Sequence, residues 1–355
     1  MDLVIDGGRS RCRAALYRDG VRLGEVATGP GVPAVAEAGG PAAAAAAAAF
    51  ARVLDQLDLG DRPLGSACVG VTGVLGTGPA AELVAAALRP LVRARRILVT
   101  SDVVTGYCGA VGLGPGVVVA AGTGAIALAV GRGAAARVDG WGWLLGDAGS
   151  GFEVGRRGLA AALRAHDGRD GSPLLAKLAE RELGPLDEVV RVVHGAANPV
   201  RVVAGFAEQV AEAAGAGDPL ARAIWDDAAA ELAATALAAA ARVRGPEGSG
   251  APHDGPAGRW SGSVPSDRAG EPRGGAPVDR VGGGPLALSW TGGLWAARGL
   301  LLEPFLAQVG ARAAGQGLAP APPLGSALDG GRLLAGSSLP APFDALVHQT
   351  GGQDP

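Results

Sequence analysis

The segment that most constrains the fold is the opening of the chain, where a glycine turn joins two strand-like runs. Residues 2–6 are mostly apolar, Asp6-Gly7-Gly8 follows, and Arg13-Ala14-Ala15-Leu16-Tyr17 forms the second run. Arg18-Asp19-Gly20 then leads into a third run, so the pattern predicts a meander of hairpins. A Rossmann unit needs its glycine turn to open a helix, and no helical pattern follows Gly8. The opening therefore disfavours a Rossmann fold.

The rest of the first half alternates short β-branched runs with helical stretches, which is typical of α/β units packed around a mixed sheet. The predicted strands are 2–6, 13–18, 21–27, 66–71, 96–100, 116–121, 124–130 and 285–289. The predicted helices are 40–58, 79–89, 102–112 and 294–308, with a long helical region from about 152 to 244. Glycine turns recur near residues 6–8, 122–124 and 292–293, which suggests two related halves.

Two segments break this pattern. Residues 245–284 are dominated by Gly, Pro, Arg, Ser and Asp without an apolar period. Such a composition buries too little surface to order itself, so we predict a disordered insertion there. We also expect a loose tail over residues 337–355.

Composition excludes several classes of partner. The 355 residues are 48% hydrophobic, which is enough for two domains with a buried core. The net charge of -3 provides no basic field for nucleic acid or an anionic membrane surface, so we expect neither partner. The chain opens on a strand-like run instead of a charged segment and a long apolar core, which argues against a signal peptide.

Cysteine and lysine usage narrows the chemistry further. Cys12, Cys68 and Cys108 are widely separated, without a CxxC pair or clustered histidines, so neither a disulfide framework nor a zinc site is indicated. A reducing cytoplasm fits this usage. Lys177 is the single lysine and lies outside any glycine-rich loop, which argues against a Walker-type phosphate loop.

Two glycine turns are candidate phosphate sites. In Asp6-Gly7-Gly8-Arg9-Ser10, backbone N–H groups could wrap phosphate oxygens, and the aspartate could hold hydrated Mg²⁺. Gly122-Thr123-Gly124 offers a hydroxyl and a close backbone approach between two apolar runs. The alternative for each is an ordinary hairpin turn.

Two further segments carry carboxylates. Asp102, in Thr100-Ser101-Asp102, follows a strand and precedes a helix, where α/β proteins gather ligands, although Ser and Asp are also common helix caps. The stretch from Gly140 to Gly151 interleaves glycines with Trp141 and Trp143, and its Asp147 could accept from sugar hydroxyls. The alternative is a turn beside two core tryptophans.

Together, these four segments resemble the N-acetylglucosamine kinase branch of the BadF/BadG/BcrA/BcrD ATPase family. The resemblance runs from residue 2 to about 336, interrupted by the insertion. It implies an α/β, actin-like ATPase (ribonuclease H-like) fold of two domains, residues 1–115 and 116–336. ATP and Mg²⁺ would lie in the cleft, with the sugar beside them.

The resemblance also implies a role for each matching residue. Asp102 would be the base that takes the proton of the sugar 6-hydroxyl, and Asp6 would serve the metal. The sugar would contact Gly140, Trp141, Gly142, Asp147 and Ala125. The nucleotide would contact Gly8, Arg9, Ser10, Arg11, Gly122, Thr123, Gly124, Gly292 and Gly293, the last two in the adenosine loop. Positioning and charge stabilisation are most of what phosphoryl transfer requires.

Several residues depart from the family pattern. Arg9 stands in place of a glycine and Arg11 in place of a lysine, and an arginine there could crowd the phosphates or bind them. Val32 falls where related kinases carry an asparagine that bonds the sugar. Ala148 replaces a glutamate, and Ser289-Trp290-Thr291 interrupts a Ser-Gly-Gly run.

Three functions follow as hypotheses. The first is an ATP-dependent kinase that phosphorylates N-acetylglucosamine or a related hexose, as a monomer or a homodimer. The second is an activator of a radical dehydratase, which needs cluster-binding cysteines, whereas Cys12 and Cys108 lie within nucleotide-domain segments. The third is a sugar- or nucleotide-binding regulator that kept the fold and lost turnover.

Overall fold

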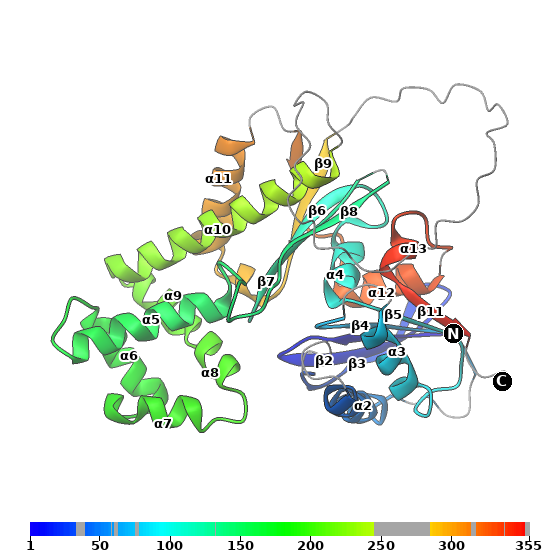
Figure 1. Cartoon of the computed structure of the whole chain (residues 1–355), viewed down its shortest axis with the longest axis horizontal. Helices are drawn as coiled ribbons and strands as arrows, with labels where there is room; N and C mark the ends of the chain where they lie inside the picture. The colour runs from blue at the N-terminus through cyan, green and yellow to red at the C-terminus, as the bar shows by residue number, and fades with distance from the viewer. Residues whose placement is uncertain are drawn as a thin grey trace.

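The protein contains two mixed β-sheets with helices packed around them (Figure 1). The computed structural model describes residues 1–32, 40–57, 59, 63–74, 78–131, 133–244, 285–313, 317–336 and 338–351. The predicted insertion at 245–284 lies outside the described residues. Within them, the predicted α/β class is confirmed.

The first sheet begins with the predicted meander and continues with parallel strands. Its strand order is β11-β5-β4-β1-β2-β3. The strands are β1 (Asp2–Gly7), β2 (Arg11–Arg18), β3 (Val21–Pro30), β4 (Leu64–Val71), β5 (Ala94–Thr100) and β11 (His348–Gly351). β1, β2 and β3 pair antiparallel, whereas β4 pairs parallel with both β1 and β5.

The second sheet repeats this plan. Its order is β10-β9-β6-β7-β8, with β6 (Gly116–Ala121), β7 (Ala125–Val130), β8 (Ala135–Asp139), β9 (Leu286–Thr291) and β10 (Leu318–Pro320). β6, β7 and β8 form an antiparallel meander, and β9 pairs parallel with β6 and β10. The shared topology agrees with two related halves.

Helices of the first half cover the first sheet. They are α2 (Gly40–Leu54) and α3 (Pro79–Leu88), whereas α4 (Asp102–Val111) contacts strands of both sheets, β1 and β4 of the first and β6, β7 and β9 of the second. The predicted helix at 294–308 is divided into a 3₁₀ turn η2 (Gly293–Ala296), a π-helical turn η3 (Arg298–Leu302) and α11 (Glu303–Arg312). Pro304 lies in the first turn of α11, where its missing N–H is tolerated.

The predicted long helical region packs beside the second sheet as a body of six helices and one 3₁₀ turn (Figure 1). They are α5 (Gly151–His166), α6 (Pro173–Leu183), η1 (Leu186–Glu188), α7 (Val189–His194), α8 (Pro199–Gly205), α9 (Ala207–Gly215) and α10 (Pro219–Val243). Side-chain oxygens of Ser150, Ser172, Asn198 and Asp218 cap α5, α6, α8 and α10. These caps satisfy backbone N–H groups that have no partner within the helix.

Helix α12 (Ala327–Gly336) packs closely against α4 and on β1 and β4 of the first sheet. A Cβ built on Gly330 would lie 1.9 Å from the Thr105 carbonyl oxygen, and one on Gly109 would lie 2.0 Å from the Ser326 carbonyl oxygen. Only glycine permits backbones this close. Residues 327–336 were predicted to belong to the second domain, yet they pack on the first sheet.

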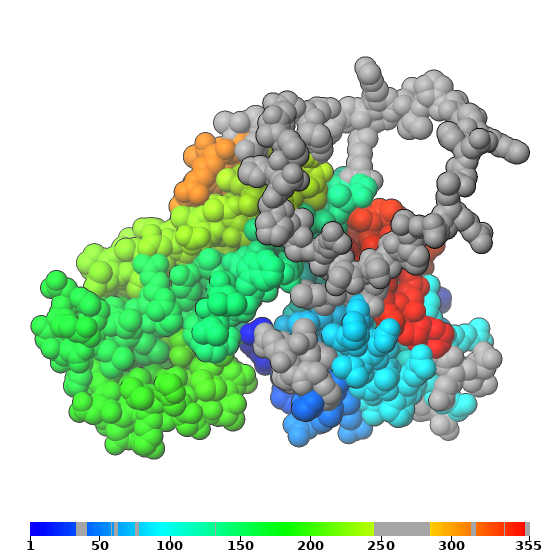
Figure 2. All heavy atoms as spheres, viewed as in Figure 1, coloured from blue at the N-terminus to red at the C-terminus, as the bar shows by residue number. Residues whose placement is uncertain are grey.

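The described part of the tail, residues 338–351, is folded, contrary to the expectation of a loose segment over 337–355. In its described part, α13 (Phe343–Leu346) precedes β11, and β11 pairs antiparallel with β5. Phe343, Leu346 and Val347 are buried. Figure 2 shows these C-terminal residues, in red, against the blue and cyan residues of the first half. The backbone of β11 supplies the pairing, which a composition-based expectation does not capture.

Candidate active site

The two predicted glycine turns meet between the sheets. The Ser10 Oγ lies 2.8 Å from the Thr123 Oγ1, which joins the β1–β2 turn to the β6–β7 turn. Each turn is closed by its own backbone bond, from the Gly8 N–H to the Arg11 carbonyl and from the Gly122 N–H to the Gly124 carbonyl. Residues 113 positions apart thus form one polar surface.

A third glycine turn lies against the second. Gly292 follows β9 with a φ of +102°, and a Cβ there would lie 2.2 Å from the Ala121 carbonyl oxygen at the end of β6. Both the positive φ and the close approach require glycine. Gly293 then starts η2. The structure thus places the predicted adenosine turn beside the Gly122-Thr123-Gly124 turn.

Asp102 begins α4 at the carboxyl end of β5, as the sequence predicted. Its Oδ1 accepts from the Val103 N–H at 2.9 Å and from the Ser101 hydroxyl at 3.2 Å. Burial raises the pKa of Asp102 to about 6, and the nearby charge of Asp6 adds to this shift. The carboxylate therefore binds a backbone N–H group in the first turn of its helix and also changes protonation state near neutral pH.

Asp6 lies at the end of β1 and forms an ion pair with Arg13, its partner residue on β2. The Arg13 Nε and Nη2 donate to the Asp6 Oδ2 at 3.1 and 2.5 Å. Burial raises the pKa of Asp6, and the Arg13 charge opposes that rise. Sequence reasoning gave Arg13 no role, although residues facing each other across a short hairpin could have revealed the pair.

Asp147 lies in a tight turn beside the second glycine turn. It adopts a φ of +59°, and its carboxylate accepts from the Gly142 N–H at 3.2 Å and from the Ala125 N–H. A Cβ on Gly124 would lie 2.5 Å from its Oδ2, so glycine makes room for this carboxylate. Burial raises the pKa of Asp147 to about 6. Four predicted residues, Asp147, Gly142, Ala125 and Gly124, are thus in contact.

Asp139 builds this turn and was assigned no role from the sequence. Its two carboxylate oxygens accept from the Asp147 and Ala148 N–H groups, each at 2.8 Å. It has a φ of +60° and is followed by Gly140 at +71°. An aspartate directly before the glycine run was the available signal, because aspartate tolerates such turn conformations.

The two tryptophans of this turn are not core residues. Trp141 is 61% exposed and Trp143 is 44% exposed. The Arg137 guanidinium lies 4.5 Å from the Trp141 ring centroid, and Trp143 packs on Phe152 with 5.3 Å between ring centroids. Both indole rings therefore reach the surface, and each also contacts a neighbouring side chain.

The residues that depart from the family pattern have distinct positions. Burial dominates the raised pKa values of Asp102 and Asp147, and the charge of Arg9 opposes the rise in both. The Arg9 charge is therefore close enough to act on both carboxylates. Arg11 is exposed. Val32 is buried beneath the first turn, where its N–H donates to the Gly8 carbonyl at 3.0 Å.

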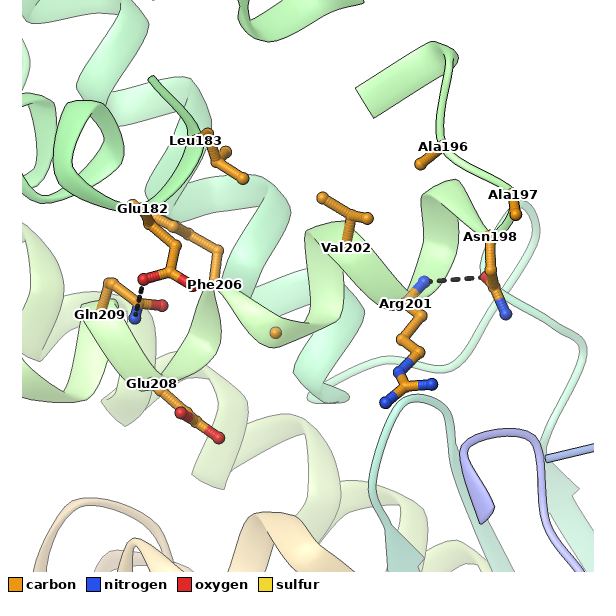
Figure 3. A pocket seen from close by; sticks show the side chains of 11 residues that line it. Glu182, Leu183, Ala196, Ala197, Asn198, Arg201, Val202, Phe206, Glu208 and Gln209 are labelled. Carbon is orange, nitrogen blue, oxygen red and sulfur yellow. Dashed lines mark hydrogen bonds between the residues drawn. The ribbon is translucent and has the colours of Figure 1, made fainter. Parts of the chain in front are cut away.

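A separate pocket of about 530 Å³ lies in the helical body (Figure 3). It is bordered by α6, α8 and α9, and contains none of the predicted site residues. The Gln209 amide donates to Glu182 at 3.3 Å within it. We assign this pocket no role.

The cysteines lie in the cores. Cys12 packs in the core of the first sheet, whereas Cys68 and Cys108 share another apolar cluster. All three are buried, and burial raises the pKa of Cys12 and of Cys68 to about 12. Across the described ranges, no helix has the length and apolar character needed to cross a membrane.

Two similar sheets whose glycine turns meet at buried carboxylates define an actin-like ATPase fold, and solved structures agree. A Chromobacterium violaceum protein provisionally named an N-acetylglucosamine kinase aligns with a TM-score of 0.65 and 23% identity, over 94% of this chain and 98% of that one. A ROK family glucokinase from Streptomyces griseus, solved with glucose and AMPPNP, aligns with a TM-score of 0.55 and 17% identity over the same shares. The predicted fold is confirmed.

The family follows from the sequence profile. The profile of the BadF/BadG/BcrA/BcrD ATPase family matches residues 3–248, and the chain belongs to this family. An N-acetylmuramic acid/N-acetylglucosamine kinase from Clostridium acetobutylicum is 31% identical over 109 residues. That match spans 30% of this chain and 35% of the relative's length.

Proposed function

We propose that this protein is an ATP-dependent sugar kinase that transfers the γ-phosphate to the 6-hydroxyl of an amino sugar, N-acetylglucosamine or a related hexose. The observation that carries the proposal is the half-buried Asp102 carboxylate, whose pKa is raised to about 6 near two glycine turns that touch each other. A base whose pKa lies just below the working pH is largely ionised and still accepts a proton well. Asp102 would take the proton of the attacking hydroxyl.

The glycine turns are suited to the nucleotide. Their backbones approach closely, and the Ser10 and Thr123 hydroxyls already lie 2.8 Å apart, so one phosphate oxygen could be reached from both sheets. We assign the phosphate contacts to Gly8, Arg9, Ser10, Arg11, Gly122, Thr123 and Gly124. Gly292 and Gly293 are assigned to the adenosine.

Asp6 fits Mg²⁺ as a single carboxylate ligand. Arg13 donates to its Oδ2, which leaves Oδ1, and Mg²⁺ bound to nucleotides uses one or two carboxylates with waters and phosphate oxygens. The ion would offset phosphate charge when bound. Asp6 and Asp102 also repel one another, and a cation near both would relieve that repulsion.

The Asp147 turn is suited to the sugar. The Asp147 carboxylate can accept from sugar hydroxyls while the Gly142 and Ala125 N–H groups hold it in place. The exposed Trp141 ring offers an apolar face of the kind that stacks on sugar rings. Gly140, Trp141, Gly142, Asp147 and Ala125 are therefore our acceptor-site residues. Names of relatives support an amino sugar, and the buried thiols support a cytoplasmic location.

A second candidate, a sugar- or nucleotide-binding regulator without turnover, is favoured by one observation. The Asp6–Arg13 pair engages the carboxylate that the metal would use, and Asp6 is nearly buried. If this ion pair persists when nucleotide binds, Asp6 is not available to Mg²⁺, and nucleotide would bind without phosphate transfer.

The test is a phosphorylation assay across hexoses and amino sugars with ATP and Mg²⁺, comparing the native protein with Asp102→Asn. Removing a general base lowers kcat by about 10²- to 10⁴-fold, and we expect calorimetry to show retained sugar binding. Asp344→Asn is the matched control, because Asp344 also accepts from the next residue's N–H, at 2.9 Å, yet is exposed. Sugar binding without turnover in the native protein would support the regulator, and full turnover in Asp102→Asn would leave Asp102 with a structural role alone.

A further inference from the structure

The turn that carries the two tryptophans exposes an unusual amount of apolar surface. Nine large hydrophobic side chains are exposed among the described residues, and four of them lie within residues 141–145. Beside the two tryptophans, Leu144 is 73% exposed and Leu145 is 82% exposed. We call residues 141–145 the apolar turn. Clustered exposed apolar side chains mark binding surfaces, whereas isolated ones do not.

The backbone of the apolar turn is fixed. The Gly146 and Leu145 N–H groups donate to the Gly142 carbonyl at 2.8 and 3.2 Å. On its two sides, a Cβ at Gly140 would lie 2.6 Å from the Ile126 Cδ1, and one at Gly146 would lie 2.4 Å from the Asp139 Oδ1. These bonds and close approaches define the backbone of the turn that presents the four exposed side chains.

The apolar turn adjoins the acceptor site. The Gly142 N–H, at its centre, donates to the Asp147 carboxylate, which we assign to the sugar. The Arg137 guanidinium covers one face of the Trp141 ring and thereby fixes its orientation. A sugar bound at Asp147 would therefore have an apolar surface directly beside it.

The size of the apolar turn favours a small occupant. A stable dimer interface buries about 800 Å² on each partner, across 20 to 30 residues, and a five-residue turn provides far less. An aromatic or acyl group attached to a sugar matches two tryptophans and two leucines in size and chemistry.

Building on the proposed function, we propose that the apolar turn binds an apolar substituent of the acceptor, so that this kinase prefers an amino sugar carrying an aryl or long acyl group to the free monosaccharide. Asp147 binds the hydroxyls and the turn binds the substituent. The reaction itself is unchanged.

The experiment compares N-acetylglucosamine with its phenyl β-glycoside and with N-benzoylglucosamine, which carry an aromatic ring at different positions. Affinity is measured by calorimetry, and kcat/KM is measured with ATP and Mg²⁺. We expect at least one aromatic sugar to bind about tenfold more tightly than N-acetylglucosamine. Leu144→Ser and Leu145→Ser should remove most of that difference and leave N-acetylglucosamine unchanged. Leu324→Ser, at a leucine 80% exposed outside the turn, is the matched control and should change nothing.

The proposal is overturned if the native protein binds neither aromatic sugar more tightly, or if the turn variants weaken all three sugars equally. The second result would indicate that the first half covers the turn when the protein closes. A dimer that dissociates in Leu145→Ser would also overturn it. Calorimetric discrimination without phosphate transfer would refute the kinase alone, whereas transfer without discrimination would refute this inference alone.

Discussion

The two halves of the molecule share one strand plan, yet their first turns differ in chemistry. In the first half, Asp6 faces Arg13 one pair before the β1–β2 turn. At the corresponding place before the β6–β7 turn, Ala120 faces Ile126. The repeated topology thus supplies two similar glycine turns, and of these two only the first follows an ion pair. We infer that the halves divide the work, with charge at Asp6 and Asp102 in one and the acceptor carboxylate Asp147 in the other.

The helices that follow the two parallel strand pairs differ in the same way. Asp102 starts α4, and burial raises its pKa to about 6. Asp329 lies in the first turn of α12, where partial burial raises its pKa but hydrogen bonds from Ser326 and nearby arginines lower it overall. The surroundings of Asp102 disfavour its ionised form, whereas those of Asp329 stabilise the anion. A raised carboxyl pKa is typical of a functional group, and a pKa lowered by hydrogen bonds is typical of a structural one.

The largest effect should come from exchanging these two aspartates for asparagine. Above pH 6, Asp102 is ionised in the folded state at a cost in free energy. The unfolded state, in which the pKa of Asp102 is near 3.8, does not have this cost. Asp102→Asn should therefore raise the free energy of unfolding near pH 8 by on the order of 3 kcal/mol, and change it little near pH 4, where the folded carboxyl is protonated.

Asp329→Asn should act in the opposite direction. Because the pKa of Asp329 is lower in the folded state, its carboxylate stabilises the fold at pH values above its ordinary pKa. That stability is lost as the pH falls through the folded-state pKa. We expect a loss of about 1 kcal/mol near pH 8. Urea unfolding of both variants at the two pH values measures the contrast, and two shifts of the same sign would contradict it.

The next effect concerns the ion pair. Arg13→Ile leaves the Asp6 carboxylate buried without its donor, and should cost about 2 kcal/mol of stability. The double variant Asp6→Ala/Arg13→Ile copies the second half and should recover most of that loss, because no buried charge remains. Thermal unfolding near neutral pH decides the matter. A double variant less stable than Arg13→Ile would mean that the two turns are not equivalent.

The smallest effect concerns the contact between the halves. A double-mutant cycle of Ser10→Ala and Thr123→Ala should give a coupling energy of about 0.5 kcal/mol, low because both hydroxyls are exposed. Thr123→Ser keeps the hydroxyl and is the control that should preserve the coupling. A coupling of zero would show that the turns touch without supporting each other.

Local patterns predicted most of the fold. The meander β1–β3 and strands β4, β5, β6, β7 and β9 match their predicted positions closely, because their signals lie in neighbouring residues. β8, β10 and β11 were missed because they are short and lack an alternating pattern. The predicted region 152–244 divides where glycines, prolines and capping residues punctuate it, as at Gly171-Ser172-Pro173.

The candidate site was predictable only in part. Asp102 and Asp147 could be placed at turns from local sequence, whereas the Ser10–Thr123 contact joins residues 113 positions apart and has no local signal. Asp139 differs, because its place directly before the glycine run was a local signal for a turn, although its two bonds to the Asp147 and Ala148 N–H groups were not. Val32 lies where an asparagine was expected to bond the sugar, yet its side chain packs within a core.

The return of α12 and β11 to the first sheet has a consequence for synthesis on the ribosome. Strand β5 lacks its outer partner, and β1 and β4 lack part of their cover, until residues 327–351 have been translated. The first half therefore waits for nearly the whole chain, with an open strand edge prone to pairing with other nascent chains. A ribosome that terminates after α11 would release a protein with both glycine turns and an unfinished first sheet.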